Sequence, residues 1–560
     1  MRKTFPYNMT LLATCALLAG LTSASFAQSD LASVNGVVRD ASGAVIPNAN
    51  VTLRNQDNGA ERKTTTSAAG SYTITSLPAG TYTLIAEASG FKRFELSRNI
   101  VAANVTATID ATLTLGAISE IVQVTSEAPS LQADSATLGR DVTEKQIRDL
   151  QLNGRNPLLL AMLKPGVVGG PGQALGGFSF SLNNAINING GRSQDALITQ
   201  DGAVAVRTRS NGTSIGVADA DSTQEVQILT ANYNAEYGRA SGGQIRIVTK
   251  SGTKDLHGAA YEYFRNSALD ANSWSRNNDP DPALNSQAAP LKFNQFGFSV
   301  GGPVSIPKIF NRDRNKLFFL FGQEYVRFRQ DLQNNLTTSQ FVPSLAMRQG
   351  DFSELLGPNI FFNTPRVITD PNTGAPFPNN VIPKNRLSPN GIGLLNIFPA
   401  PNTTGALNYQ QTAAGPQNQR KDTGSLDYYP ADGHYIRFRV LNFEFNQVIP
   451  FASNYLVIPQ TFDRPNQTAS VNYIWNISPT LVNEVLATAS VDRVNIRIDP
   501  ANGLFDRNKY GINYPYLFPG SKNIDNKIPS VALSGPFNEL SGLPYPSNSA
   551  GPIYDKWLST

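Results

Sequence analysis

The chain of 560 residues has very little cysteine and histidine, and this shortage excludes several kinds of chemistry. It holds one Cys, at position 15, and two His. A zinc site needs about four ligands, which Cys and His supply in most cases, and a disulfide within the chain needs a second Cys. We therefore expect no metal, no cofactor, no Ser/His/Asp constellation and no enzymatic activity.

Charged residues are also scarce. They make up 16% of the chain, whereas soluble proteins usually carry about 25%. The net charge of +4 is small for this length, and no basic run with interleaved aromatics occurs, so we expect no nucleic-acid partner. The 45 Gly, 36 Pro and 29 Phe favour a mainly β protein that is rich in turns.

Long apolar runs are missing except for a short one near the N-terminus. Arg2 and Lys3 precede the apolar residues Leu11–Leu21, and small residues follow at Ser25-Phe26-Ala27. This order predicts a secretory signal peptide over residues 1–27. A membrane anchor fits less well, because a helix needs about 20 apolar residues to span a bilayer. Any contact with membrane lipid must therefore come from strands.

Residues 31–115 read as short strands separated by turn signals. Val34 and Val38 share one face of a strand, as do Tyr72 and Ile74. Short alternating strands at this spacing predict a sandwich of about seven strands. Tyr72 and Tyr82 could stack on sugars, but packing in the core is the favoured interpretation.

The sequence of these strands resembles that of the carboxypeptidase regulatory-like domain. The similar motifs are Gly36-Val-Val-Arg-Asp40-Ala-Ser-Gly43, Leu77-Pro78-Ala-Gly80-Thr-Tyr82 and Gly90-Phe91. The resemblance implies a transthyretin-like or carbohydrate-binding-like sandwich with an accessory role, and it implies no peptidase.

A short extended run follows the sandwich. Ile121–Thr125 is closed by Pro129, and a free strand between two domains can be gripped by another protein that adds a strand of its own. The alternative is that Ile118–Val124 is the last strand of the first domain. The residues alone leave both interpretations open.

Residues 130–252, which we call the plug segment, mix short helices with strands that carry polar residues. Thr143-Glu-Lys-Gln146 is a capping box for a helix through Leu150. Asn156-Pro157 starts a second helix. The Gly-rich stretch Gly166–Gly177 follows a helix and lacks the Lys-Ser/Thr ending of a phosphate-binding loop, so we expect no nucleotide site. A small domain whose strands carry polar residues fits the water-filled interior of a large barrel.

From residue 256 onward, long runs alternate apolar and polar positions and end on aromatic residues, which is typical of an antiparallel transmembrane β-barrel. Phe296 and Phe298 alternate with Gln295 and Gly297. A soluble sandwich would also alternate, but strands longer than the usual 5–6 residues or so favour the membrane. The seven predicted strands are His257–Asn266, Phe293–Gly301, Lys316–Arg329, Lys421–Tyr429, Tyr435–Asn446, Gln467–Ile477 and Leu481–Arg493.

The connections between these strands alternate in length, as expected for a barrel with extracellular loops and periplasmic turns. The predicted loops are Ser267–Lys292, Gln330–Arg420 and Gln447–Asn466, and each is longer than any of the turns Gly302–Asn315, Pro430–His434 and Ser478–Thr480. The longest loop either binds substrate or is a solvated loop with local turns. Seven strands cannot close a barrel, so we expect 256–560 to be an incomplete barrel in an N-terminal fragment of a longer receptor.

The plug segment resembles the plug of TonB-dependent outer-membrane receptors, in particular the Oar-like branch, where a carboxypeptidase regulatory-like domain precedes the plug. The similar motifs are Leu152-Asn-Gly-Arg-Asn156, Asn189-Gly-Gly-Arg-Ser193, Asn234-Ala-Glu-Tyr-Gly-Arg239 and Thr249-Lys-Ser-Gly252. Gln200 departs from the pattern, since a hydrophobic residue is expected before Asp201-Gly202.

The resemblance implies a receptor in the outer membrane of a Gram-negative bacterium. Such a receptor contacts outer-membrane lipid and imports an extracellular ligand, here unidentified, with energy from the inner membrane through TonB. It further implies a TonB box within 119–127. The expected TonB-contacting residues are Glu120, Ile121, Val122, Gln123, Val124, Thr125 and Ser126.

Three plug arginines have two open interpretations. Arg155, Arg192 and Arg239 either tie polar loops to the barrel wall or bind ligand, and the structural role is favoured. Two rival functions also remain at this point. One is an outer-membrane adhesin or structural surface protein of the same fold that does not transport, and the other is a secreted enzyme with an accessory module.

Overall fold

The structure, a computed structural model, describes residues 31–515 with gaps, and beyond these 526, 528 and 553–559. The predicted signal peptide, Glu120, Ser126 and Arg239 lie outside the described residues. Within the described part of the chain, no helix combines the length and the apolar character needed to cross a membrane. The gaps are 104, 119–120, 126–137, 151, 170–185, 193–194, 207–213, 234–237, 239, 279–281, 287, 289, 331–336, 363, 405–406, 414, 451–458, 479–480, 499–502 and 505.

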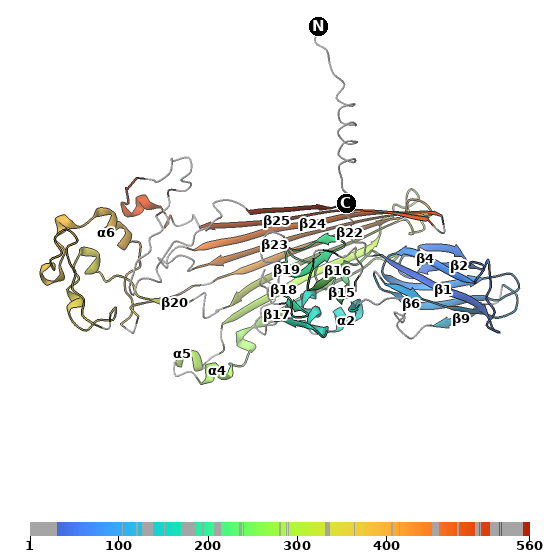
Figure 1. The fold of residues 1–560 in the computed structure, drawn as a ribbon, viewed down its shortest axis with the longest axis horizontal. Helices are drawn as coiled ribbons and strands as arrows, with labels where there is room; N and C mark the ends of the chain where they lie inside the picture. The colour runs from blue at the N-terminus through green and yellow to red at the C-terminus, as the bar shows by residue number, and fades with distance from the viewer. Residues whose placement is uncertain are drawn as a thin grey trace, which may run out of the picture.

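The N-terminal domain is a two-sheet sandwich (Figure 1). Strands β7 and β8 pair in parallel with successive parts of β1, so they act as one interrupted strand, and residues 31–115 then hold the seven strands that the sequence predicts. Strand β9 adds an eighth. One sheet has the order β4-β1-β7 with β8 also on β1, and the other has the order β3-β2-β5-β6-β9. The bounds are β1 (Ala32–Asp40), β2 (Asn50–Asn55), β3 (Glu61–Thr65), β4 (Ser71–Leu77), β5 (Gly80–Glu87), β6 (Arg93–Val101), β7 (Thr106–Thr108), β8 (Ala111–Leu113) and β9 (Ile121–Thr125).

The sandwich core is built from the alternating apolar residues of both sheets, among them Val34, Leu53 and Leu84, which are fully buried. Tyr72 and Tyr82 belong to this core. The Tyr72 hydroxyl donates to the Ile109 carbonyl at 2.6 Å, and the Tyr82 hydroxyl donates to the Pro78 carbonyl at 2.8 Å. Both rings therefore pack inside the domain rather than on a sugar-binding surface.

The plug segment forms a five-stranded sheet of order β10-β15-β16-β13-β14. The capping box at Thr143 starts α2 as predicted, and the Asn156 side chain caps η2, which is a 3₁₀ helix. Gln200 is buried, and its Oε1 accepts from the Ala218 backbone N–H at 2.8 Å, which explains a polar residue at this position. The bounds are β10 (Leu138–Thr143), α2 (Glu144–Asp149), η1 (Asn153–Arg155), η2 (Pro157–Leu163), β11 (Val167–Gly169), β12 (Ile186–Ile188), β13 (Ala196–Gln200), β14 (Ala203–Val204), β15 (Thr223–Ala231) and β16 (Gly243–Thr249).

The rest of the chain forms one antiparallel sheet of eight described strands, in the order β17-β18-β19-β22-β23-β24-β25-β26 (Figure 1). We call it the long sheet. All seven predicted strands are present, and β26 was not predicted. The bounds are β17 (His257–Asn266), β18 (Leu291–Pro303), β19 (Leu317–Gln330), β22 (Gln417–Tyr428), β23 (His434–Ile449), β24 (Gln460–Ser478), β25 (Leu481–Ile498) and β26 (Ile553–Ser559).

The long sheet buries its polar face and exposes its apolar face. Thr423 and Ser425 are 1% and 2% exposed, whereas Phe298 and Val471 are 41% and 42% exposed. The plug segment contacts the polar face, where the Ser425 hydroxyl donates to the Lys250 carbonyl at 3.0 Å. An exposed apolar face opposite a covered polar face is the arrangement of a transmembrane barrel wall that faces lipid.

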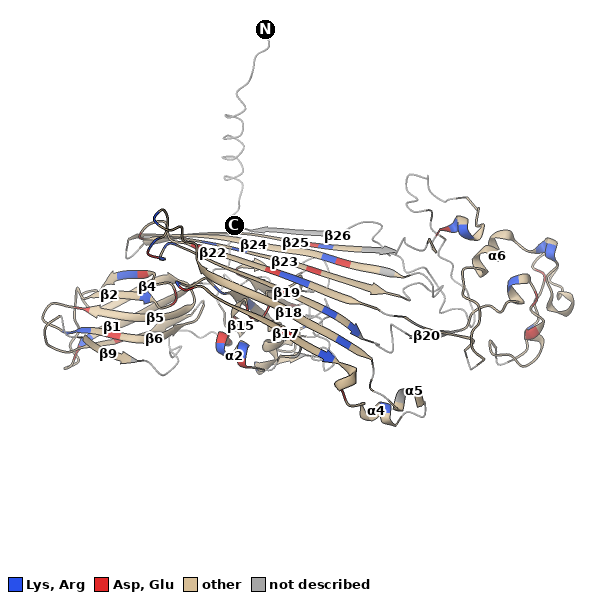
Figure 2. Cartoon of the chain, turned by 180° about the vertical axis from the view of Figure 1, so that it is seen from behind, with Lys and Arg blue, Asp and Glu red and all other residues tan. Residues whose placement is uncertain are grey.

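Charged residues concentrate toward one end of the long strands, next to β20 and α4 (Figure 2). This is the end with the connections 267–290, 331–416 and 450–459, and we call it the long-loop end. The other end has the connections 304–316, 429–433 and 479–480, and we call it the short-turn end.

The prediction that every loop is longer than every turn fails in one place. The ten residues 450–459 are fewer than the thirteen residues 304–316, because β23 and β24 extend beyond the predicted strands.

The longest connection is folded, so the interpretation as a solvated loop with local turns is wrong. Val342, Phe398 and Tyr409 share a hydrophobic cluster with Ile512 and Ile528, which follow β25. We call this body, the described residues of 337–412 with those of 503–515 and residues 526 and 528, the outer body. Its elements, with those of the 267–290 loop, are η5 (Ser267–Leu269), α4 (Trp274–Asn277), α5 (Pro282–Asn285), β20 (Thr337–Gln340), η6 (Met347–Gln349), η7 (Ser353–Leu356), η8 (Pro378–Asn380), η9 (Lys384–Arg386), α6 (Pro389–Leu395), β21 (Tyr409–Thr412) and η10 (Arg507–Tyr510).

Candidate functional site

Strand β9 holds the described part of the predicted TonB box. It pairs in parallel with β6, with Arg93 opposite Ile121 and Ser97 opposite Thr125. It is also the last strand of its sheet, and β6 is its one neighbour among the described strands. Ile121 is 57% exposed and Val124 is 40% exposed. The strand thus belongs to the sandwich and still presents an exposed edge to a partner.

The backbone of β9 alternates between its paired edge and its open edge. The Val124 carbonyl lies on the β6 side, where the Ser97 hydroxyl donates to it at 3.4 Å. Because successive residues of a strand direct their N–H and C=O groups to opposite edges, Gln123 directs its own groups toward the open edge. Such unpaired groups are a template for an added strand.

Arg155 joins the plug segment to the wall of the long sheet. Its guanidinium pairs with Asp221 of the plug segment at 2.5 Å and donates to the Tyr263 hydroxyl of β17 at 2.6 Å. Its central carbon lies 4.8 Å and 4.6 Å from the ring centroids of Tyr261 and Tyr263. Through these contacts Arg155 links the plug segment to β17 of the long sheet.

A buried carboxylate extends this contact across the sheet. Glu324 of β19 accepts from the Tyr261 hydroxyl at 3.1 Å, from the Gln295 amide at 2.8 Å and from the Lys421 ammonium at 3.0 Å. Gln295 also donates to the Gly154 carbonyl, next to Arg155, at 3.2 Å. Four strands of the wall and one turn of the plug segment therefore share one polar network.

Arg192 has local contacts instead. Arg192 hydrogen-bonds Asp195 of its own turn at 3.0–3.3 Å, and its side chain is 82% exposed. The guanidinium lowers the pKa of the Asp195 carboxyl. Arg239 lies outside the described residues. Arg155 and Arg192 thus have different surroundings, although similar motifs carry them.

The sandwich contacts the plug segment through the loop after β6. The Ala103 N–H donates to Glu225 Oε2 of β15 at 3.1 Å, and the Ala103 carbonyl accepts from the Gln227 side-chain amide. A third contact runs from the Gln224 amide to the Ala79 carbonyl at 3.2 Å. Ala103 is fully buried by this docking.

Glu225 and Gln227 lie on a polar face of the plug sheet. They alternate along β15 with Val226 and Ile228, which point into the apolar core. Gln227 is flanked across the sheet by Asp141 of β10 and Arg246 of β16.

Burial raises the pKa of both acidic groups on this face. It raises the pKa of Glu225 to about 8, with the nearby Asp141 carboxylate adding to the effect. It raises the pKa of Asp141 to about 6, against the opposing charges of Arg246 and Lys164. Burial of this face thus favours the protonated form of both carboxyl groups.

The sandwich also contacts the short-turn end of the long sheet. Leu31 packs with Tyr435 and Ile474. The Asn58 amide donates to the Tyr429 hydroxyl at 3.2 Å, and the Lys254 N–H donates to the Asp57 carbonyl at 2.9 Å. The domain is thus fixed to the barrel wall as well as to the plug segment.

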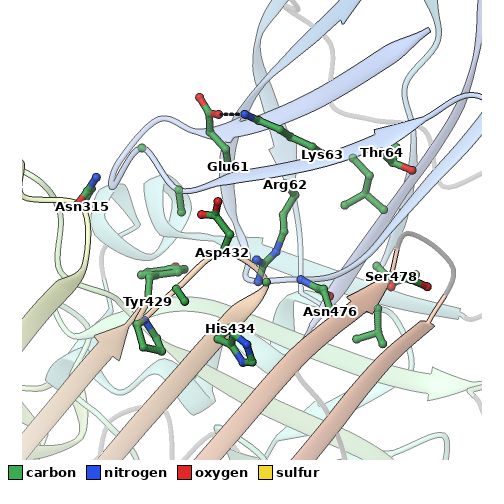
Figure 3. Close-up of a pocket in the computed structure, with 18 of the residues that line it drawn as sticks. Glu61, Arg62, Lys63, Thr64, Asn315, Tyr429, Asp432, His434, Asn476 and Ser478 are labelled. Carbon is green, nitrogen blue, oxygen red and sulfur yellow. Dashed lines mark ion pairs between the residues drawn. The ribbon is translucent and has the colours of Figure 1, made fainter. Parts of the chain in front are cut away.

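A cavity of about 930 Å³ lies between the sandwich and these turns. Figure 3 shows Arg62 reaching from β3 toward the turns, between Asp432 and Asn476. With the Asn476 amide in its hydrogen-bonding orientation, its oxygen accepts from Arg62 at 3.1 and 3.2 Å. Glu61 and Lys63 pair with each other at 3.2 Å beside it. These two contacts join polar groups of the cavity lining to one another, and they indicate no particular class of ligand.

Sequence reasoning missed the contact of Ala103 with β15 and the network around Glu324. The one available signal was a charged or amide residue inside an otherwise apolar strand, as at Glu225 and Gln227. Within the described residues, no group of three or more His, Cys, Asp and Glu side chains could hold a metal ion.

Comparison with known families gives two matches. Residues 248–555 match the outer membrane beta barrel domain, and residues 33–114 match the carboxypeptidase regulatory-like domain. The chain is also 28% identical over 313 residues to the TonB-dependent transporter Oar of Myxococcus xanthus. That similarity covers 54% of this chain and 27% of the transporter, so the chain spans well under half of this relative.

Solved structures with a similar chain path include two outer-membrane proteins. The outer membrane transporter YddB from Escherichia coli has a TM-score of 0.39 at 11% identity, covering 64% of this chain and 39% of that chain. A mutant of the ferric enterobactin receptor PfeA from Pseudomonas aeruginosa has a TM-score of 0.36 at 13% identity, covering 64% and 41%. At these values the family matches, and not the structures, carry the assignment.

Proposed function

The chain belongs to the outer membrane beta barrel domain family, and from that premise we propose that it works as a TonB-dependent receptor that imports an extracellular ligand. The family assigns the protein to the outer membrane of a Gram-negative bacterium. TonB adds a strand at Glu120–Ser126 and transmits energy from the inner membrane. The plug segment then rearranges and the ligand passes. No covalent chemistry is assigned to the chain.

The observation that carries the proposal is the position of β9. It is an exposed edge strand, and twelve residues, 126–137, connect it to β10, the first strand of the plug sheet. Strand addition to an open edge uses backbone hydrogen bonds and makes few demands on side chains. A pull on β9 is therefore carried along the chain directly to the plug sheet.

The arrangement of the other parts supports the same direction of transport. The sandwich and β9 lie at the short-turn end, which is the periplasmic side of a barrel with this loop pattern. The outer body lies at the opposite end (Figure 1), where we expect extracellular ligand to bind. Arg155 and Glu324 hold the plug segment to the wall between the two ends.

The test compares Gln123→Pro with Gln123→Ala in the full-length receptor. Proline removes the N–H that β9 directs to its open edge, whereas alanine keeps it. We expect receptor in native membranes to capture the purified periplasmic domain of TonB as wild type and as Gln123→Ala, and to lose this capture as Gln123→Pro.

Two results would contradict the proposal. Equal capture by both variants would show that β9 is not the pairing strand. Failure of the wild type to bind TonB would favour the alternative, an adhesin or structural surface protein of the same fold that does not transport.

A further inference from the structure

The sandwich, β9 and the plug sheet meet around a single segment of chain. Strand β6 pairs with β9 along its first half. Two residues after β6 ends, Ala103 binds Glu225 and Gln227 of β15. Strand β15 is itself the partner of β10, the plug strand that follows β9 in the chain. One segment of the sandwich, Arg93–Ala103, therefore contacts the strand before residues 126–137 and the sheet after them.

The part of the plug sheet under Ala103 is unusual for an interior. Gln227 and Arg246 are 1% and 0% exposed, and Glu225 is 5% exposed. The Gln227 side chain accepts from Arg246 at 3.3 Å and donates to Glu225 at 2.9 Å. Asp141 lies across the strand pair from Gln227. One acidic group, one cation and one amide are thus kept from water beside the same loop, and a second, partly buried acidic group lies next to them.

Removal of polar groups from water costs free energy unless hydrogen bonds replace the lost hydration. The backbone of Ala103 supplies two such bonds, and loss of the loop would leave Glu225 and Gln227 without them. Water would then enter along β15, and hydration would favour separation of β15 from its neighbours. A contact of this composition holds firmly while it is intact and gains hydration when it opens.

We infer that the sandwich is a removable cover on the polar face of the plug sheet, which it holds through Ala103 and releases when β9 is pulled. Since β9 is a strand of the sandwich, a pull that keeps β6 and β9 paired withdraws the cover together with the strand. The pulling step rests on the proposed function, whereas the covering contact does not depend on TonB.

Hydrogen exchange of the full-length receptor, without TonB, tests the cover. The variant is Ala103→Glu, which places a third acidic side chain against Glu225 and Asp141 and changes only the sandwich side of the contact. The Lys254 amide, which donates to the Asp57 carbonyl of the sandwich, reports docking. The amides of β15 and β16 report the plug sheet.

We expect Ala103→Glu to speed exchange at Lys254 and along β15 and β16 by tenfold or more, while β2 and β5 of the sandwich core keep their wild-type rates. The matched control is Ala69→Glu, the same substitution at an exposed turn of the sandwich, and it should leave every rate unchanged. If Ala103→Glu unfolds the sandwich, Gln227→Met removes the bond to the Ala103 carbonyl from the plug side and adds no charge.

Unchanged exchange of β15 and β16 in both variants would overturn the inference. Because TonB is absent, that result would leave the role of β9 in TonB pairing untouched. Loss of TonB capture by Gln123→Pro together with normal exchange in Ala103→Glu would keep the proposed function and reject the cover.

Discussion

Arg155 and Arg192 provide the sharpest test of how the plug segment is held, because similar motifs carry both and the structure gives them different surroundings. The Arg155 side chain is 15% exposed and pairs with Asp221, which is 23% exposed. The Arg192 side chain is 82% exposed and pairs only three residues away. We expect replacement of each by Ala to affect the plug segment very differently.

The size of the Arg155→Ala effect follows from the lost contacts. A hydrogen bond to a charged group contributes about 1.5–3 kcal/mol, and a cation–π contact contributes about 0.5–1 kcal/mol at partly exposed sites. Because the two hydrogen bonds and two ring contacts share one guanidinium, we expect a combined loss of about 3 kcal/mol rather than the full sum. An exposed local ion pair such as Arg192–Asp195 contributes about 0–1 kcal/mol.

Hydrogen exchange along β15 and β16 measures the difference. A loss of about 3 kcal/mol corresponds to exchange about 100-fold faster, since each 1.4 kcal/mol or so is a factor of ten, and Arg192→Ala should stay within about fivefold of wild type. Tyr263→Phe, which removes one hydrogen bond and keeps the ring, should lie between them. Equal exchange in Arg155→Ala and Arg192→Ala would refute the assignment of Arg155 to the plug–wall contact.

Two further predictions concern buried charges. Lys421→Met leaves Glu324 buried without its cation. In urea unfolding it should therefore lower the free energy of unfolding by about 3–5 kcal/mol. The matched control Arg420→Met, at a more exposed site, should lower it by less than about 1 kcal/mol. For Glu225, burial raises the pKa to about 8, so the docked form retains a proton that an exposed Glu loses near pH 4.5. Docking should therefore be strongest at low pH and weaken as pH rises toward about 8, seen as faster exchange of the Lys254 amide, and Glu225→Gln should remove most of this pH dependence.

Local patterns predicted the strands and caps because they depend on neighbouring residues. The alternation of Phe296 and Phe298 with Gln295 identified a wall strand, and the capping box at Thr143 identified the start of α2. Strand ends were predicted less well. Strand β24 begins at Gln460, seven residues before the predicted start at Gln467, and it includes Pro465, although proline in a strand normally marks an edge or a bulge.

Contacts between distant segments could not be predicted from such patterns. Ala103 and Glu225 are 122 residues apart, and nothing near either residue indicates the other. The outer body was missed for the same reason, since Val342 packs with Ile512 and Ile528 only after the strands between them are in place. A Pro- and Asn-rich sequence therefore left open a solvated loop or a substrate-binding loop, although it contributes four of the six buried residues of a hydrophobic cluster.

Strand β9 shows why the two interpretations of its sequence were not true alternatives. A strand inside a sheet has no free backbone groups, and an isolated strand has groups free on both edges, but β9 is an edge strand with one neighbour among the described strands. Partner pairing at its open edge needs no release from β6. Under the proposed function, TonB would pull the whole sandwich rather than a loose segment, and the sandwich contacts the same plug strand, β15, to which β10 is paired. An accessory domain in this position therefore changes what the applied force must break first.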